Sequence, residues 1–242
     1  MAEFDSIRST TQSDARASID SGLRAHMNKV YGLMAVAMVI TGSVAWSIGT
    51  SPQLVYALFS NQIISLVIMF APLGFVFFLS AKVMKMSYAG GQLAFWLFSA
   101  LMGLSLSTIF VVYTGASIAN AFFTTAIAFG AMSLFGYTTK KDLSGMGRFL
   151  FMGVIGLIVA MIINWFTQSP GLEFAINVLG VLIFAGLTAY DTQNIKNTYL
   201  SFRSAPNGEE IAAKAGILGA LSLYINFLNM FMFLLHFMGN RE

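Results

Sequence analysis

Seven mostly apolar stretches divide this chain, and each is long enough to cross the hydrocarbon core of a lipid bilayer as a helix. A spanning helix needs about 20 such residues, because lipid offers no hydrogen-bond partner to an unpaired backbone. Of the 242 residues, 57% are hydrophobic and 10% are charged, whereas a typical soluble domain carries about 25% charged residues. We therefore predict an all-α integral membrane protein that folds as a seven-transmembrane-helix bundle. The stretches are residues 30–48, 54–81, 91–113, 117–137, 149–166, 174–190 and 215–238.

The basic residues are distributed unevenly between the two ends of these stretches. All but one of the 13 Lys and Arg residues fall on one side of a seven-span arrangement, and the exception is Arg241. Because cytoplasmic loops carry an excess of Lys and Arg, we predict a cytoplasmic N-terminus and a C-terminus outside. A six-span alternative would return the C-terminus to the cytoplasm and would make 215–238 re-entrant, but that stretch is too long and too apolar to favour it. The basic residues flank spans, so we expect lipid and no nucleic acid as a partner.

Residues 1–26 are polar and lack the short apolar core and cleavage site of a secretory signal. We predict that they form a cytoplasmic N-terminal tail, mobile and with some helix near the membrane, and that residues 27–242 form the transmembrane domain. The chain has no cysteine, which excludes disulfides and thiol catalysis. His26 and His236 are far apart in sequence, so a histidine metal cluster is not expected, nor is any cofactor.

One carboxylate stands out because it directly follows an apolar stretch. Residues 174–190 contain few polar side chains, among them Thr188, and Asp191 comes next. A carboxylate at or inside a membrane boundary is costly unless it is solvated or paired, and such residues often mark ion or proton pathways. We therefore predict that Asp191 binds or gates an ion near the cytoplasmic boundary. The alternative is a solvated residue that ends the sixth helix.

The seventh stretch carries Ser222, Asn226 and Asn229, spaced four and three residues apart. This spacing places the three side chains on one face of a helix. Polar residues on one face of a spanning helix usually point into the bundle, where they can meet Asp191. The alternative is hydrogen bonding between helices without any permeating ion.

Four segments carry specific sequence signatures. They are Gly-Leu-Thr-Ala-Tyr-Asp-Thr-Gln at 186–193, Ser-Leu-Phe-Gly-Tyr-Thr-Thr-Lys-Lys-Asp-Leu-Ser at 133–144, Ala-Pro at 71–72 followed by Phe-Leu-Ser-Ala-Lys-Val-Met-Lys-Met-Ser at 78–87, and Ala-Leu-Ser-Leu-Tyr-Ile-Asn-Phe-Leu-Asn at 220–229. These segments resemble the Bax inhibitor-1 family of membrane proteins, in its bacterial branch, and the resemblance covers the chain from about residue 20 to its end. It implies a seven-helix bundle with a central, hairpin-like sixth helix, and a pH-sensitive cation leak, chiefly for Ca²⁺, controlled by two aspartates.

The chain departs from the family pattern at one of the two acidic positions. The resemblance places one family aspartate at Asp191 and the other at Asn226. An Asp–Asn pair keeps a hydrogen bond but loses the repulsion between two carboxylates and one negative ligand for Ca²⁺. We therefore expect weaker Ca²⁺ preference and weaker pH gating here, with Asp191 as the ligand for any bound Ca²⁺. Lys82 could latch the bundle by pairing with Asp191, and the alternative for Lys82 is topological anchoring.

Two functions fit these residues, and both place the protein in the bacterial inner membrane as a multi-pass protein. The first is a Ca²⁺ or H⁺ leak, or an ion-homeostasis role, in which Asp191 and Asn226 bind and gate the ion and Ser222, Asn229 and Thr188 give polar support. The second follows from the resemblance, because some bacterial relatives are associated with a membrane-integrated AAA protease as its substrate and modulator. In that role the chain would not conduct ions and would be engaged through residues 1–26.

Enzymatic activity is not expected. Ser117 and His236 are both predicted at the outer side of the bundle, where a serine–histidine dyad could form. However, the residue after this serine is Ile118, whereas such a nucleophile is commonly followed by glycine. A second aspartate of the kind that intramembrane aspartyl proteases need is also absent from the sequence.

Overall fold

The computed structural model describes residues 2–203 and 205–240, with side chains from residue 20 onward. The described chain is almost entirely helical and contains no β-strand. Its elements are α1 (Ala2–Gly49), α2 (Pro52–Phe59), α3 (Gln62–Lys82), the short 3-10 helix η1 (Val83–Lys85), α4 (Tyr88–Leu106), α5 (Ile109–Val112), α6 (Gly115–Thr138), α7 (Ser144–Thr167), α8 (Pro170–Phe202) and α9 (Gly208–Met238).

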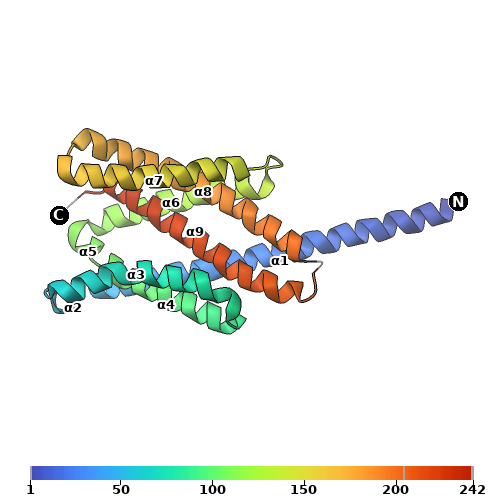
Figure 1. Ribbon diagram of the computed structural model, residues 1–242, viewed down its shortest axis with the longest axis horizontal. Coiled ribbons are helices and arrows are strands. Elements are labelled where there is room, and N and C mark those ends of the chain that lie inside the picture. The colour runs from blue at the N-terminus through green and yellow to red at the C-terminus, as the bar shows by residue number, and fades with distance from the viewer. Residues whose placement is uncertain (1, 204, 241–242) are drawn as a thin grey trace.

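Seven of the helical segments are long and apolar enough to cross a membrane, which confirms the predicted number of spans. The segments lie side by side and alternate in direction, so the connecting loops gather at two faces of the bundle (Figure 1). We call the face that carries 203–207 and the projecting end of α1 the N-terminal face. The opposite face, which carries 168–169 and 239–240, is the C-terminal face. The spans are Asp20–Gly49, Gln62–Lys85, Tyr88–Val112, Gly115–Thr138, Ser144–Thr167, Pro170–Phe202 and Gly208–Met238.

The predicted second span, residues 54–81, was wrong as a single helix. The chain breaks at Ser60 and Asn61, which separate α2 from α3. The Asn61 side chain accepts hydrogen bonds from the backbone N–H groups of Ile63 and Ile64 and so caps α3. Asn is a favoured N-cap because its oxygen satisfies backbone donors that have no partner within the helix. In the sequence, Ser60, Asn61 and Gln62 mark this boundary only as a short polar interruption between two apolar stretches.

The N-terminal segment, predicted from sequence as a mobile tail with some helix, is part of a long helix in the structure. α1 is one helix from Ala2 to Gly49, and its first part projects beyond the bundle at the N-terminal face (Figure 1). Leu23 and His26, assigned to the tail by sequence, are buried in the bundle. The bundle therefore includes the last residues of the segment that the sequence assigned to the tail.

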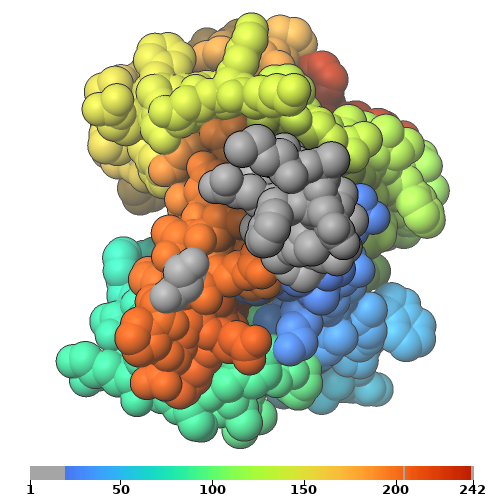
Figure 2. Space-filling view, turned by 90° about the vertical axis from the view of Figure 1, so that its right-hand side faces the viewer, coloured from blue at the N-terminus to red at the C-terminus, as the bar shows by residue number. Residues whose placement is uncertain are grey.

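α9, the seventh span, is the central helix of the bundle, whereas the family resemblance implied a central sixth helix. Most of the apolar part of α9 is buried, and it packs against α1, α4, α6 and α8. By contrast, α7 packs chiefly against α8 and leaves most of its side chains exposed, as expected for a helix that faces lipid. Figure 2 looks onto the N-terminal face, where the orange ends of α8 and α9 lie between α7 above and α4 below.

Candidate functional site

Asp191 and Asn226 form the polar centre of the interface between α8 and α9. Asn226 Nδ2 donates a hydrogen bond of 2.7 Å to Asp191 Oδ2. Both side chains are buried, with exposed fractions of 9% for Asp191 and 5% for Asn226. The second carboxylate oxygen, Oδ1, has no hydrogen-bond partner in the part of the chain that the structure describes. One oxygen is therefore held by the amide, and the other is available to a ligand.

Asp191 does not end its helix, as the alternative interpretation from sequence proposed. α8 continues to Phe202, so Asp191 lies roughly 16 Å inside that end at about 1.5 Å per residue. Asp191 can contact α9 at this depth because the two helices approach closely. Gly219 of α9 packs directly against the side chain of Ile195 of α8. A Cβ at Gly219 would lie 2.6 Å from that side chain. The helices can thus approach closely enough for direct contact between their polar side chains.

The three polar residues at 191–193 point in three directions, since successive helical residues are rotated by about 100°. Asp191 meets α9, whereas the Thr192 hydroxyl shares a 2.9 Å hydrogen bond with Ser133 on α6. Gln193 faces the loop before α7: its Oε1 accepts from the backbone N–H of Leu143, and its Nε2 donates to the carbonyl of Lys141, both at 2.8 Å. Thr192 and Gln193 therefore fix the orientation of α8 and leave Asp191 as the group that faces a cavity.

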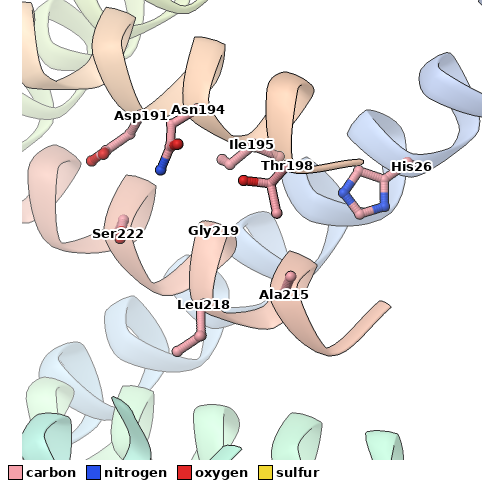
Figure 3. Close-up of a pocket in the computed structure, with 9 residues that line it drawn as sticks. All are labelled: His26, Asp191, Asn194, Ile195, Thr198, Ala215, Leu218, Gly219 and Ser222. Atoms are coloured by element: carbon pink, nitrogen blue, oxygen red, sulfur yellow. The ribbon is translucent and has the colours of Figure 1, made fainter. Parts of the chain in front are cut away.

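A cavity of about 180 Å³ opens beside Asp191 toward the N-terminal face. Figure 3 shows Asp191 and Ser222 at its inner end and His26 of α1 at the other end. The α8 side contributes Asn194 and Thr198, three and seven residues after Asp191 and so on the same helical face. Its complete lining is His26, Asp191, Asn194, Ile195, Thr198, Ala215, Leu218, Gly219 and Ser222.

A second cavity, of about 380 Å³, lies on the other side of the same carboxylate between α7, α8 and α9. Asp191 and Ser222 line both cavities, and Asn226 and Asn229 line the second. The remaining wall is mostly apolar, with Phe184 and Phe233 among its aromatic residues. The Asp191–Asn226 pair therefore separates a polar cavity at the N-terminal face from a more apolar cavity inside the bundle.

The other residues selected from the sequence occupy different environments. Asn229 lies on the cavity side of α9, and its Nδ2 donates to the carbonyl of Ile225. Thr188 is fully buried and donates to the carbonyl of Phe184, so it supports the helix and does not line either cavity. Lys82 is exposed at the end of α3, and no ion pair joins it to Asp191 within the described residues. The structure thus brings Ser222, Asn226 and Asn229 to the site but leaves Lys82 outside it.

Ser117 and His236 make no hydrogen bond to each other in the described residues. Ser117 Oγ accepts from the backbone N–H of Asn240 and from the hydroxyl of Thr114, while His236 Nδ1 contacts the carbonyl of Met232 at 2.6 Å. Both side chains are therefore held by neighbouring backbone groups. The structure shows no dyad geometry at this place.

Sequence reasoning missed His26, Asn194 and Thr198 as residues of the site. The spacing of Asn194 and Thr198 after Asp191 could have revealed them, because all three share one face of α8. No local pattern marks His26, which reaches the cavity only because α1 packs beside α8. Its ring stacks on that of Tyr199, with centroids 4.7 Å apart.

The chemistry of the site is that of oxygen ligands around a single carboxylate. Hard cations such as Ca²⁺ are bound by carboxylate, amide and hydroxyl oxygens, usually six to eight of them with water included. Within the described residues, no group of three His, Cys, Asp or Glu side chains could form a closed metal site. Asp191 is thus suited to a partly hydrated cation or a proton in passage, rather than to a tightly held metal.

Seven apolar spans that surround a buried carboxylate between two cavities define a polytopic membrane protein with a polar site inside its bundle. The family model described as inhibitor of apoptosis-promoting Bax1 matches residues 23–242. The chain therefore belongs to the Bax inhibitor-1 family, which confirms the family inferred from sequence.

Bacterial proteins are similar to this chain along nearly its whole length. The inner membrane protein YbhL of Escherichia coli K12 is 45% identical over 233 residues, which cover 96% of this chain and 98% of YbhL. An uncharacterized protein of Caulobacter vibrioides is 46% identical over 244 residues, covering 97% and 96%, and one of Rickettsia prowazekii is 40% identical over 239 residues, covering 99% of both chains. The chain is a multi-pass protein of the bacterial inner membrane.

Proposed function

We propose that this protein is a cation leak of the inner membrane, for Ca²⁺ or H⁺, in which Asp191 is the ion ligand and the Asp191–Asn226 pair is the gate. The observation that supports this function is the position of the pair between two cavities, both lined by Asp191. A buried carboxylate with one uncommitted oxygen can replace part of a cation's hydration shell. Breaking a single hydrogen bond would then join the cavities. The N-terminal face is cytoplasmic in this proposal, because the basic loops lie there.

Proteoliposome flux measured with Ca²⁺- and H⁺-sensitive dyes tests the proposal. Asp191→Asn keeps the size of the side chain and removes its charge, so it should reduce flux severalfold. Asp142→Asn is the matched control, because Asp142 is exposed in the loop before α7 and is far along the chain from the site. Equal flux in wild type and Asp191→Asn would remove Asp191 from the permeation path.

The second candidate is a non-conducting substrate and modulator of a membrane AAA protease, engaged through residues 1–26. The projecting first part of α1 supports it, because a partner could reach that helix without displacing the bundle. The variant that tests this role should lack residues 1–18 and no more, since Leu23 and His26 are buried in the bundle. Loss of protease modulation with unchanged flux in this deletion would assign modulation to the tail and conduction to the bundle.

We propose no enzymatic activity, and a serine-reactive fluorophosphonate that labels Ser117 would overturn that.

A further inference from the structure

A crevice runs along the outside of the bundle between α1 and α6. Its first half, next to the N-terminal face, measures about 540 Å³, and its second half measures about 710 Å³. Tyr31 and Phe129 line both halves, so the two form one continuous groove, which we call the α1–α6 crevice. Its lining residues Val39, Phe123 and Leu134 are more than half exposed, so the crevice opens toward the surrounding lipid.

The crevice exists because both of its helices line it with small residues. Gly42 on α1 and Gly130 on α6 lie along it, and a Cβ at either position has open space within 4 Å. α1 packs instead against α4 and α9, and the buried Phe227 ring of α9 forms the floor, with its centroid 5.5 Å from those of Phe122 and Phe129. The lining of an empty groove loses van der Waals contacts, so we expect a lipid chain to fill this one.

The lining of the crevice changes from polar to apolar along its length. The polar residues of the first half are Arg24, Asn28, Tyr31, Ser133 and Tyr137, whereas all the residues that line the second half are apolar except Tyr31. Among the described residues, neither half is lined by Asp or Glu. Basic pockets between spanning helices favour anionic lipid headgroups, and the apolar half suits a hydrocarbon chain. The crevice therefore has the polarity of a phospholipid with an anionic head.

Two cations lie at the polar end of the crevice, which we call its mouth. Arg24 is exposed and makes no ion pair within the described residues, although Asp20 lies one helical turn before it on α1. Lys196 of α8 lies 5.4 Å from the centre of the Tyr137 ring, and its Nζ donates to the Tyr137 carbonyl at 2.9 Å. This bond leaves the other N–H groups of the Lys196 ammonium for a ligand. Arginine binds phosphate through two parallel hydrogen bonds, and lysine binds it as a point charge.

The mouth lies at the depth of the lipid headgroups. A hydrocarbon core of about 20 helical residues, counted back along α1 from Gly49, ends near Lys29. Arg24 and Asn28 therefore lie in the headgroup layer. From Asn28 to Met38 the crevice extends about 15 Å along α1 at about 1.5 Å per residue. This length equals one leaflet, which is half of a core about 30 Å thick.

We propose that the α1–α6 crevice binds an anionic phospholipid from the leaflet at the N-terminal face. The phosphate lies between Arg24 and Lys196, and one acyl chain runs along the crevice past Tyr31. An ethanolamine lipid would place its ammonium beside the same two cations, and no described carboxylate lines the crevice to receive it. Phosphatidylglycerol is therefore preferred over phosphatidylethanolamine. This binding does not depend on the proposed leak function.

Native mass spectrometry of the purified full-length protein in detergent measures the proposed binding. Phosphatidylglycerol and phosphatidylethanolamine with identical chains are titrated separately, and wild type should bind the glycerol lipid at least about fivefold more tightly. Arg24→Gln should weaken phosphatidylglycerol binding about fivefold, since this is the contribution of one basic residue near an anionic headgroup. Arg148→Gln is the matched control and should bind as wild type does, because Arg148 is exposed at the same face on α7 and lines neither half of the crevice.

Gly130→Phe tests the seat of the acyl chain separately from the charge. Its ring should occupy the first half of the crevice and weaken the binding of both lipids severalfold, while the midpoint of thermal unfolding without added lipid stays at the wild-type value. Gly42→Phe places a ring in the second half and gives an independent variant for the same measurement. Equal affinity of wild type for the two lipids would overturn the proposal. Phosphatidylglycerol binding that is unchanged in Arg24→Gln and in both filled variants would also overturn it, because the lipid would then bind elsewhere on the bundle.

Discussion

Asn226 on α9 donates its amide to the Asp191 carboxylate on α8 at a distance of 2.7 Å. The two residues are 35 positions apart in sequence, on successive helices. Their hydrogen bond therefore forms only when α8 and α9 pack against each other in this arrangement. A neutral donor beside a carboxylate leaves one negative charge between the two cavities. The predictions that follow depend on this arrangement and on the contacts that hold α8 in place.

Replacing Asn226 by Asp should introduce pH dependence into the flux. Two carboxylates at this distance cannot both be ionised without strong repulsion, so the pair would share a proton and titrate as one unit. The second negative oxygen should also strengthen inhibition or competition by Ca²⁺. Proteoliposome flux against pH, for wild type and Asn226→Asp, checks both effects. Identical pH profiles would contradict the assigned role of the pair.

Gly136→Ala should destabilise the bundle by about 1–3 kcal/mol, because an added methyl group would overpack the contact of α6 with α8. A Cβ at Gly136 would meet the backbone of Ala189, two residues before Asp191. Gly130→Ala is the matched control on the same helix, since a Cβ there has open space within 4 Å. Thermal unfolding in detergent should lower the midpoint for Gly136→Ala alone, and equal midpoints would argue against the close approach.

Gln193→Leu should release the loop before α7. The Gln193 amide makes hydrogen bonds to both Lys141 and Leu143, and leucine can replace neither. We expect trypsin to cleave after Lys140 and Lys141 severalfold faster in this variant, because cleavage needs local opening of the backbone. Asn197→Leu, at an exposed position on α8, should cleave at the wild-type rate. Unchanged cleavage in Gln193→Leu would show that the loop is held by other contacts.

Fusions at Glu242 should report a C-terminus outside the cytoplasm. The prediction rests on the basic residues of the N-terminal face, whereas Arg241 and Glu242 lie outside the described residues. Alkaline phosphatase fused there should be active, and green fluorescent protein should be dark. A fluorescent fusion without phosphatase activity would contradict the predicted orientation of the bundle.

The number of spans and the Asp191–Asn226 neighbourhood could be predicted from sequence because each depends on a local pattern. A bilayer demands long apolar helices, and polar residues at helical spacing must face inward. The helix break at Asn61 was missed, although Ser60, Asn61 and Gln62 form a short polar interruption, because the apolar stretches beyond them were read as one span. The end of the sixth span was placed too early for a related reason, since Thr192 and Gln193 look solvated in sequence but are buried by α6 and by the loop before α7.

Residues contributed by distant helices were the least predictable part of the site. His26 reaches the cavity from α1 although 165 positions separate it from Asp191, and no periodicity relates the two. The central place of α9 likewise depends on packing against four other helices, which hydrophobicity alone does not specify.

The unbroken course of α1 has a mechanical consequence. One helix carries the projecting segment that begins at Ala2, His26 at the cavity, and Tyr31, whose hydroxyl is 2.8 Å from Ser133 on α6. Ser133 in turn contacts Thr192, the neighbour of Asp191. Because α1 is unbroken, a force that pulls on its free end would also displace His26 and Tyr31. These two residues contact the region around the Asp191 carboxylate. In the proposed leak, pulling on α1 and opening the path at Asp191 would then involve the same displacement.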